Sequence, residues 1–172
     1  MKETIRYAWG TSSLGPFLAA SSDCGLVALE FAKHDGPLAA SLTSRFPEAE
    51  FVQDSTGLKE TVEKATSLIE HPAAVANVRV DMRGSEFERA VWSALQEIPT
   101  GRTTSYVELA CRLGGPRLAQ RVGEACAANK IAVVIPCHRV LRKNGSISGY
   151  RWGTWRKRAL LEREYFANFT LT

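Results

Sequence analysis

The chain of 172 residues is long enough for one sizeable hydrophobic core or for two small domains that share an interface. Its 45% hydrophobic and 23% charged residues are typical of an ordinary globular protein and speak against intrinsic disorder. No apolar run approaches the roughly 20 residues of a membrane-spanning helix, and the first ten residues lack the apolar core of a signal peptide. We therefore expect a cytoplasmic protein without a membrane partner.

Charge is distributed unevenly along the chain. Residues 1–80 carry 7 Lys and Arg against 10 Asp and Glu, whereas residues 81–172 carry 15 against 8. A basic half favours a polyanionic partner, most simply nucleic acid, although a solvated basic face would give the same balance. The net charge of +4 thus conceals a basic C-terminal half.

The first 80 residues predict a small α/β domain. Three short apolar stretches separated by Gly, Pro, Ser and Asp indicate strands of an antiparallel sheet. They lie at residues 4–11, 15–22 and 25–32. Helical spacing follows at 36–46 and 54–71, and an extended segment at 75–84 then leads to the basic half. We therefore predict two domains, 1–80 and 81–172.

Short helices are predicted for the second half. Ser85 followed by Glu88 is a capping-box pattern that begins a helix over 85–99. A helix within 100–115 that ends at Gly114 and Gly115, followed by a second one from Pro116, indicates helix-turn-helix geometry with residues 116–127 as the recognition helix. Many proteins that never contact DNA also contain such helix pairs.

The remaining C-terminal segments alternate between apolar and loop-forming patterns. The run at 131–141 predicts a buried, strand-like segment. A Gly-rich loop with aromatic residues is expected at 142–155, and an amphipathic helix at 156–166.

The cysteines show no CxxC pair and no regular spacing. A zinc site or a disulfide framework is therefore not expected, and we predict no metal and no cofactor. Free cysteines usually behave as small buried hydrophobes, so we expect Cys24, Cys111 and Cys126 to be buried thiols.

Cys137 differs from the other three because it follows Pro136 at the end of an apolar run and precedes His138 and Arg139. A histidine that accepts a proton and nearby positive charge turn a weakly reactive thiol into a thiolate. The local sequence therefore favours a nucleophile. A structural cysteine remains the alternative, because adjacent residues need not lie on the same face.

The sequence around Cys137 resembles a known family signature. "IPCHRV" at 135–140, preceded by "AANK" at 127–130 and followed by "GSISGYRWG" at 145–153, is similar to the signature of the O6-alkylguanine-DNA alkyltransferases. The likeness is greatest to the methyltransferase domain of bacterial adaptive-response proteins, and it covers nearly the whole chain. It implies an α/β (α+β) fold, with an N-terminal ribonuclease-H-like domain and a C-terminal winged-helix-like domain.

The resemblance implies direct-reversal DNA repair by a monomer that needs no cofactor. Such a protein binds double-stranded DNA through the minor groove and rotates the alkylated guanine out of the stack. Cys137 then accepts the methyl group of O6-methylguanine, and by extension that of O4-methylthymine, irreversibly and once per molecule. In a prokaryote this activity would place the protein at the nucleoid.

The resemblance also implies roles for individual residues. His138 takes the thiol proton through a water molecule, Glu164 orients His138, and Asn129 is a hinge between the recognition helix and the active-site segment. The residues expected at the DNA are Tyr106, Ala119, Gln120, Arg121 and Gly123. Those expected around the substrate base are Tyr106, Val140, Tyr150, Arg151 and Trp152.

Two positions depart from the family pattern. Where the family has an arginine that fills the gap left by the flipped base, this chain has Gln120, and Arg121 replaces an expected small residue. Either side chain could fill the gap. Trp152 stands in a loop expected to wall the alkyl pocket, so we predict a preference for methyl over bulky adducts such as benzyl.

Two other functions remain open from the sequence. An alkylated-DNA binding protein without repair activity is the first alternative, although relatives of that kind replace the cysteine that this chain retains as Cys137. A Cys-His hydrolase or a transcription factor is the second, and a hydrolase would turn over repeatedly whereas an alkyl acceptor would not.

Overall fold

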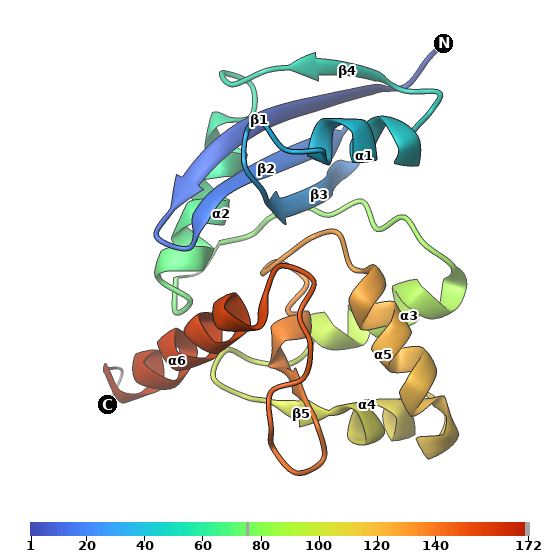
Figure 1. Ribbon diagram of the computed structural model, residues 1–172, viewed down its shortest axis with the longest axis vertical. Helices are drawn as coiled ribbons and strands as arrows, with labels where there is room; N and C mark the ends of the chain where they lie inside the picture. Colours follow the sequence, from blue (N-terminus) through green and yellow to red (C-terminus); the bar gives the residue numbers. More distant parts are fainter. Residues whose placement is uncertain (75, 171–172) are drawn as a thin grey trace.

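A four-stranded sheet lies between one short helix on one face and the remaining helices on the other face in the computed structural model, which describes residues 1–74 and 76–170 (Figure 1). The strands β1 (Thr4–Ser12), β2 (Gly15–Ser22) and β3 (Gly25–Phe31) are antiparallel neighbours, as predicted. The sheet order is β3-β2-β1-β4. Strand β4 (Glu50–Gln53) pairs in parallel with β1 and was not predicted, since four residues, two half-buried and two exposed, show no clear alternation.

The helices lie close to their predicted positions. The N-terminal part contains α1 (Leu38–Arg45) and α2 (Lys59–Glu70). The C-terminal part contains α3 (Glu86–Gln96), α4 (Tyr106–Arg112), the 3₁₀ turn η1 (Pro116–Leu118), α5 (Ala119–Ala128) and α6 (Thr154–Thr170). The predicted mixed α/β class is thereby confirmed.

Helix ends follow the capping signals of the sequence. The Glu88 amide donates to the Ser85 hydroxyl at 3.1 Å, and the Ser85 amide donates to the Glu88 carboxylate at 2.8 Å, which completes the predicted capping box of α3. Gly114 and Gly115 have φ values of +137° and +149° and join α4 to η1. Because glycine adopts such angles without strain, this turn sets the angle between the two predicted helices.

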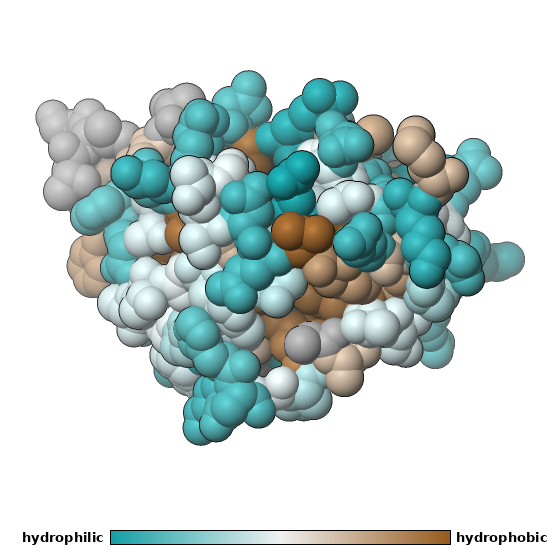
Figure 2. Space-filling view, turned by 90° about the horizontal axis from the view of Figure 1, so that it is seen from above, coloured by the Kyte–Doolittle hydropathy of each residue, from teal (hydrophilic) through white to brown (hydrophobic). Residues whose placement is uncertain are grey.

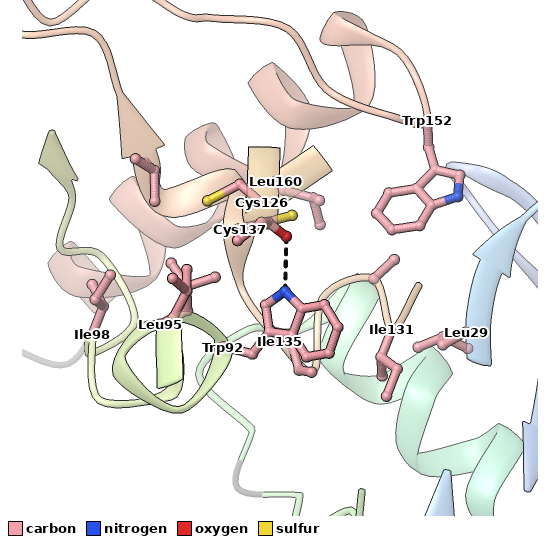
Figure 3. Packing of buried hydrophobic residues seen from close by; sticks show 14 of the residues in the cluster. Leu29, Trp92, Leu95, Ile98, Cys126, Ile131, Ile135, Cys137, Trp152 and Leu160 are labelled. Atoms are coloured by element: carbon pink, nitrogen blue, oxygen red, sulfur yellow. Dashed lines mark hydrogen bonds between the residues drawn. The ribbon is translucent and has the colours of Figure 1, made fainter. Parts of the chain in front are cut away.

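The sheet buries both of its faces. Leu18 and Ala20 belong to a cluster with α1, whereas the alternating residues Phe17 and Ala19 belong to a larger cluster that includes α2 and the C-terminal helices. Figure 3 shows part of this larger cluster, in which Trp92 of α3 donates from Nε1 to the carbonyl of Ala125 at 2.8 Å. The N-terminal and C-terminal halves therefore share one hydrophobic core.

Two segments that follow α2 in the chain complete the edge of the sheet at β3. Leu26 of β3 bridges in parallel to Val80, and Leu29 of β3 bridges in parallel to Ile131. Most of the predicted extended segment 75–84 is thus described, while residue 75 lies outside the described residues. The proposed division at residue 80 stays a prediction.

The prediction of a strand-like segment at 131–141 is wrong. Turns occupy residues 132–134, the 3₁₀ turn η2 (Cys137–Arg139) follows Pro136, and only Val140–Leu141 form a strand, β6, paired with β5 (Thr104–Ser105). Val133 has φ of 67°, which reverses the chain. Ile131, Ala132, Ile135 and Val140 are buried as expected, whereas Val133 and Val134 are half-buried. The amides of the segment bond locally, for example from Val134 to the carbonyl of Ala132 at 2.7 Å.

The prediction of three buried thiols is wrong for two of them. Cys126 is buried, whereas Cys24 and Cys111 are exposed. Cys24 lies in the turn between β2 and β3, and Cys111 lies on the outer face of α4. Short turns and outer helix faces leave even a small apolar side chain in solvent.

The surface around the sheet is largely polar. Seen from the sheet end, hydrophilic and intermediate side chains surround a smaller central area of hydrophobic ones (Figure 2). Within the described part of the chain, no helix is both long and apolar enough to cross a bilayer.

Candidate active site

Cys137 lies at the start of η2 and belongs to the shared core. Its side chain is buried, and the Asn129 Nδ2 donates to its sulfur at 3.3 Å. Burial raises the pKa of the Cys137 thiol, and the hydrogen bond from Asn129 only partly opposes this. The thiol is therefore protonated at neutral pH and needs a base before it can act as a nucleophile.

Asn129 fixes the backbone that carries the thiol. It follows the last residue of α5 and is 1% exposed. Its Nδ2 also donates to the carbonyl of Ile135 at 2.9 Å, and its Oδ1 accepts from the amide of Ile131 at 2.9 Å. One side chain thus links α5 to the turn that leads to Cys137, which is the position of the predicted hinge.

His138 and Glu164 form a buried pair between η2 and α6. The His138 Nε2 lies 2.7 Å from the Glu164 Oε1, and His138 is 0% exposed. Burial lowers the pKa of His138 despite the opposing effect of Glu164. Burial alone would raise the pKa of Glu164, but the hydrogen bond and charge of His138, together with Arg139, lower it to about 2.

These shifts determine the tautomer of His138. A neutral imidazole beside an ionised carboxylate carries its proton on Nε2 and donates it to Glu164. The Nδ1 then holds a lone pair, and it has no hydrogen-bond partner among the described residues. His138 is therefore prepared to accept a proton through Nδ1.

Arg139 contacts the carboxylate rather than the thiol. Its Nε and Nη2 donate to Glu164 at distances between 2.9 and 3.2 Å, and its Nη1 donates to the carbonyl of Ile98 at 2.5 Å. The positive charge expected to activate Cys137 thus keeps Glu164 ionised instead. Arg139 was expected to act on the thiol, and its contact with Glu164 was not predicted.

A pocket of about 390 Å³ opens beside the thiol. It is lined by residues from α4, α5, η2 and the loop before α6, namely Tyr106, Gly123, Cys126, Ala127, Cys137, Gly149, Tyr150 and Arg151. Burial raises the pKa values of Tyr106 and Tyr150, so both phenols are protonated and can donate hydrogen bonds. The pocket can accept a flat, polar group at the sulfur.

Lys157 supports the wall of this pocket and was also missed from the sequence. It is 1% exposed, and its Nζ donates to the carbonyl of Val140 at 2.7 Å and to the Ser148 hydroxyl at 3.0 Å. The Ser148 and Tyr106 hydroxyls share a hydrogen bond of 2.5 Å. Helical spacing places Lys157 on the same face of α6 as Leu160 and Glu164, and this signal could have revealed it.

The predicted DNA-contacting residues lie on and beside α5. Gln120 is exposed, and its Nε2 donates to the Glu124 carboxylate at 3.4 Å. The guanidinium of Arg121 stacks over the ring of Phe87 at 4.1 Å. Ala119 is half-buried, and Gly123 faces the ring of Tyr106, where an added Cβ would lie 3.8 Å from Cδ1.

The predicted base-contacting residues are only partly brought together. Tyr106, Tyr150 and Arg151 line the pocket with Cys137. Val140 is buried and does not line this pocket, and its carbonyl accepts a hydrogen bond from Lys157. Trp152 lies outside this lining.

The indole of Trp152 stands apart from Cys137, on the side of the N-terminal sheet (Figure 3). It packs edge-on against Tyr150 with ring centroids 5.2 Å apart. Trp152 therefore supports the pocket wall from behind.

Comparison with known proteins places this arrangement in a family. Residues 86–166, which include α3 to η2 and most of α6, match the model of the 6-O-methylguanine DNA methyltransferase DNA-binding domain. The inducible methylated-DNA–protein-cysteine methyltransferase of Bacillus subtilis is 40% identical over 120 residues, which cover 70% of this chain and 67% of that protein. The chain belongs to the 6-O-methylguanine DNA methyltransferase family.

Other members of this family extend the similarity to the complete fold. A crystal structure of Mycobacterium tuberculosis OGT in complex with DNA is 32% identical with a TM-score of 0.78, covering 95% of this chain and 94% of that one. The bifunctional transcriptional activator/DNA repair enzyme Ada of Escherichia coli is 39% identical over 160 residues, which cover 93% of this chain. This chain spans 45% of the length of that relative.

Proposed function

We propose that the protein repairs alkylated DNA directly, by transferring the methyl group of O6-methylguanine to Cys137 in a single irreversible event. The observation that carries this proposal is the position of the Cys137 sulfur. It lines a pocket that is large enough for a base, next to a buried His138–Glu164 pair. Membership of the methyltransferase family supports the choice of substrate.

Methyl transfer requires that the thiol lose a proton and that the departing guanine be neutralised. The proton of the Cys137 thiol passes to His138 Nδ1 through a water molecule, and Glu164 stabilises the resulting imidazolium. The sulfur attacks the methyl carbon, a C–S bond forms, and the C–O bond breaks with its electron pair remaining on the guanine oxygen. We assign to the Tyr106 hydroxyl, which lines the pocket, the donation of a proton that neutralises the departing base. The His138 imidazolium then releases the thiol proton to solvent, and Tyr106 regains a proton from solvent. The product thioether has no leaving group, so the protein acts once.

Access to the base requires its extrusion from the duplex, because the alkylated oxygen lies within the base stack. We propose that α5 enters the minor groove and that Gln120 occupies the gap, since Arg121 is stacked on Phe87. The family's structure in complex with DNA supports DNA as the partner. We further propose that the protein acts as a monomer in the cytoplasm.

Peptide mass after reaction tests this function. The protein is incubated with a duplex that contains one O6-methylguanine and is then digested with trypsin. Cleavage after Lys130 and Arg139 yields "IAVVIPCHR" with Cys137, while "VGEACAANK" carries Cys126. We expect one added CH₂ unit on the first peptide only, with no more than one label per molecule.

A variant without the acceptor sulfur is the control for this experiment. Cys137→Ser should abolish transfer while preserving DNA affinity, because the groove-binding surface is unchanged. A label on the Cys126 peptide, or release of methyl groups over many turnovers, would refute the proposal. Binding of the duplex by the wild-type protein without any label would instead identify a damage-recognition protein.

A further inference from the structure

A buried carboxylate from the N-terminal sheet contacts Arg151, which lines the pocket beside Cys137, called here the acceptor pocket. Glu30 lies on β3 and is 2% exposed, although carboxylates are rarely buried without partners. Its Oε2 accepts from the Arg45 Nη2 of α1 at 2.6 Å, and its Oε1 accepts from the Arg151 Nε at 3.2 Å. Glu30 does not line the pocket beside Cys137.

The Arg151 contact connects Glu30 to the wall of that pocket. Gly149, Tyr150 and Arg151 form the part of the lining that precedes α6. The side chain of Arg151 is 36% exposed, while that of Glu30 is 3% exposed. The ion pair therefore attaches a partly solvated loop to a rigid strand, and it opposes the conformational freedom that such a loop would otherwise have.

The neighbouring residue of β3 holds the other segment of the site. The Leu29 amide donates to the carbonyl of Lys130 at 2.9 Å, and the Ala132 amide donates to the carbonyl of Leu29 at 2.8 Å. These bonds fix the chain between Asn129 and Cys137. Two adjacent residues of one strand thus contact both the segment that carries the thiol and the loop that faces it.

We propose that Glu30 is a positioning residue for methyl transfer. By holding Arg151, it sets the place of residues 149–151 over the acceptor pocket, so that the N-terminal sheet controls the closure of a site to which it contributes no reacting group. This inference rests on the proposed function of Cys137. Arg45 also contributes, because its ion pair with Glu30 holds the carboxylate in the position from which it contacts Arg151.

A double-mutant cycle between Glu30 and Arg151 tests the proposal. Rates of methyl transfer are measured for the wild type, Glu30→Gln, Arg151→Gln and the double variant, each per mole of folded protein. We expect each single variant to slow transfer about tenfold, because a displaced loop misplaces the base. The double variant should be slower than either single variant by less than about twofold, since both remove the same contact.

Glu70→Gln is a matched control. Glu70 of α2 lies 3.7 Å from Arg163 of α6, so it also joins the two halves of the molecule by an ion pair, but it does not line the acceptor pocket. Its variant should transfer methyl groups at the wild-type rate. Equal slowing in Glu30→Gln and Glu70→Gln, or fully additive effects in the cycle, would overturn the positioning role.

Amide hydrogen exchange in the free protein provides a second readout that needs no methyl transfer. Glu30→Gln and Arg151→Gln should both speed exchange at residues 148–153, whereas Glu70→Gln should not. Unchanged exchange in the two loop variants would overturn the inference even if Cys137 accepts methyl groups. If exchange is faster in these two variants but the wild type transfers no methyl group, the proposed function fails while the contact between Glu30 and the loop is supported.

Arg151→Gln also covers the case in which Glu30→Gln does not fold, since loss of a buried carboxylate strands two cations. It removes the same contact from the partly exposed side. With DNA affinity measured in parallel, slower transfer at unchanged affinity together with faster loop exchange supports the proposal. A wild-type rate for Arg151→Gln overturns it.

Discussion

His138 and Glu164 are separated by 26 positions in the chain, yet their side chains meet in the core with a distance of 2.7 Å between Nε2 and Oε1. Both groups have pKa values below their ordinary range. The pair therefore consists of a neutral imidazole and an ionised carboxylate at neutral pH. This charge state links the stability of the fold to its chemistry.

Glu164→Gln should weaken the fold in a pH-dependent manner. A carboxylate with a folded pKa of about 2 stabilises the folded chain above its unfolded pKa near 4.5, and this contribution is lost as pH falls from about 5 to 2. We expect the variant to lose about 3 kcal/mol of unfolding free energy at pH 7 and almost none at pH 2. Urea denaturation of both proteins at several pH values measures the difference.

The same variant should slow methyl transfer on the order of a hundredfold, because His138 loses the group that fixes its tautomer and stabilises its charged form. Glu162→Gln, on the same helix but at an exposed position, is the control. A stability difference that is constant from pH 2 to 7 would contradict the ionised state of Glu164.

Gln120→Arg should accelerate repair of duplex DNA. A longer cationic side chain fills the gap left by the flipped base more completely, so extrusion becomes less costly. We expect the reaction to be about threefold faster on duplex DNA, where the base must be extruded, and unchanged on single-stranded DNA, where it need not be. Single-turnover rates on the two substrates provide the comparison, and equal acceleration on both would exclude a role in base flipping.

Trp152→Gly should widen the range of accepted adducts. Because Trp152 packs against the back of Tyr150, its removal lets the pocket wall recede. We expect the wild type to react roughly tenfold more slowly with O6-benzylguanine than with O6-methylguanine, and the variant to reduce this ratio. Trp152→Phe, which retains an aromatic ring, should keep it. A ratio near one in the wild type would refute the predicted preference.

The four thiols should fall into two classes of reactivity. Cys24 and Cys111 are exposed, whereas Cys126 and Cys137 are buried. An aromatic disulfide reagent should therefore modify two thiols rapidly in the native protein and the other two at least about a hundredfold more slowly. In the Cys24→Ser/Cys111→Ser double variant the rapid phase should disappear. Rapid modification of Cys137 in that variant would show that the acceptor is open in the free protein.

Sequence patterns predicted β1 to β3 and the helices well, because short apolar stretches between turn residues and the capping box at Ser85 are local signals. They failed at 131–141, where a continuous apolar run reports burial but not backbone direction. The turn there depends on Asn129, which bonds to Ile131 and Ile135. Such tertiary hydrogen bonds produce no periodic pattern in the sequence.

The site was predicted unevenly for a related reason. Cys137, His138, Asn129 and Glu164 were assigned through family resemblance, and the structure brings them together. Arg139 was expected beside the thiol but contacts Glu164, and Lys157 and Glu30 were not assigned. Each of these three residues acts through a partner that is distant in the sequence. A charge within a buried strand or helix face gives no indication of its partner until the fold is known.

Val133, four residues before Cys137, is a β-branched residue with φ of 67°. Such a conformation costs on the order of 1–3 kcal/mol and persists only where the surrounding contacts impose it. A substitution that relaxes this turn would raise the free energy of unfolding, but it would also loosen the segment that positions the Cys137 sulfur. Selection for higher thermal stability would therefore favour a relaxed turn at residue 133, whereas selection for faster methyl transfer would favour the strained one.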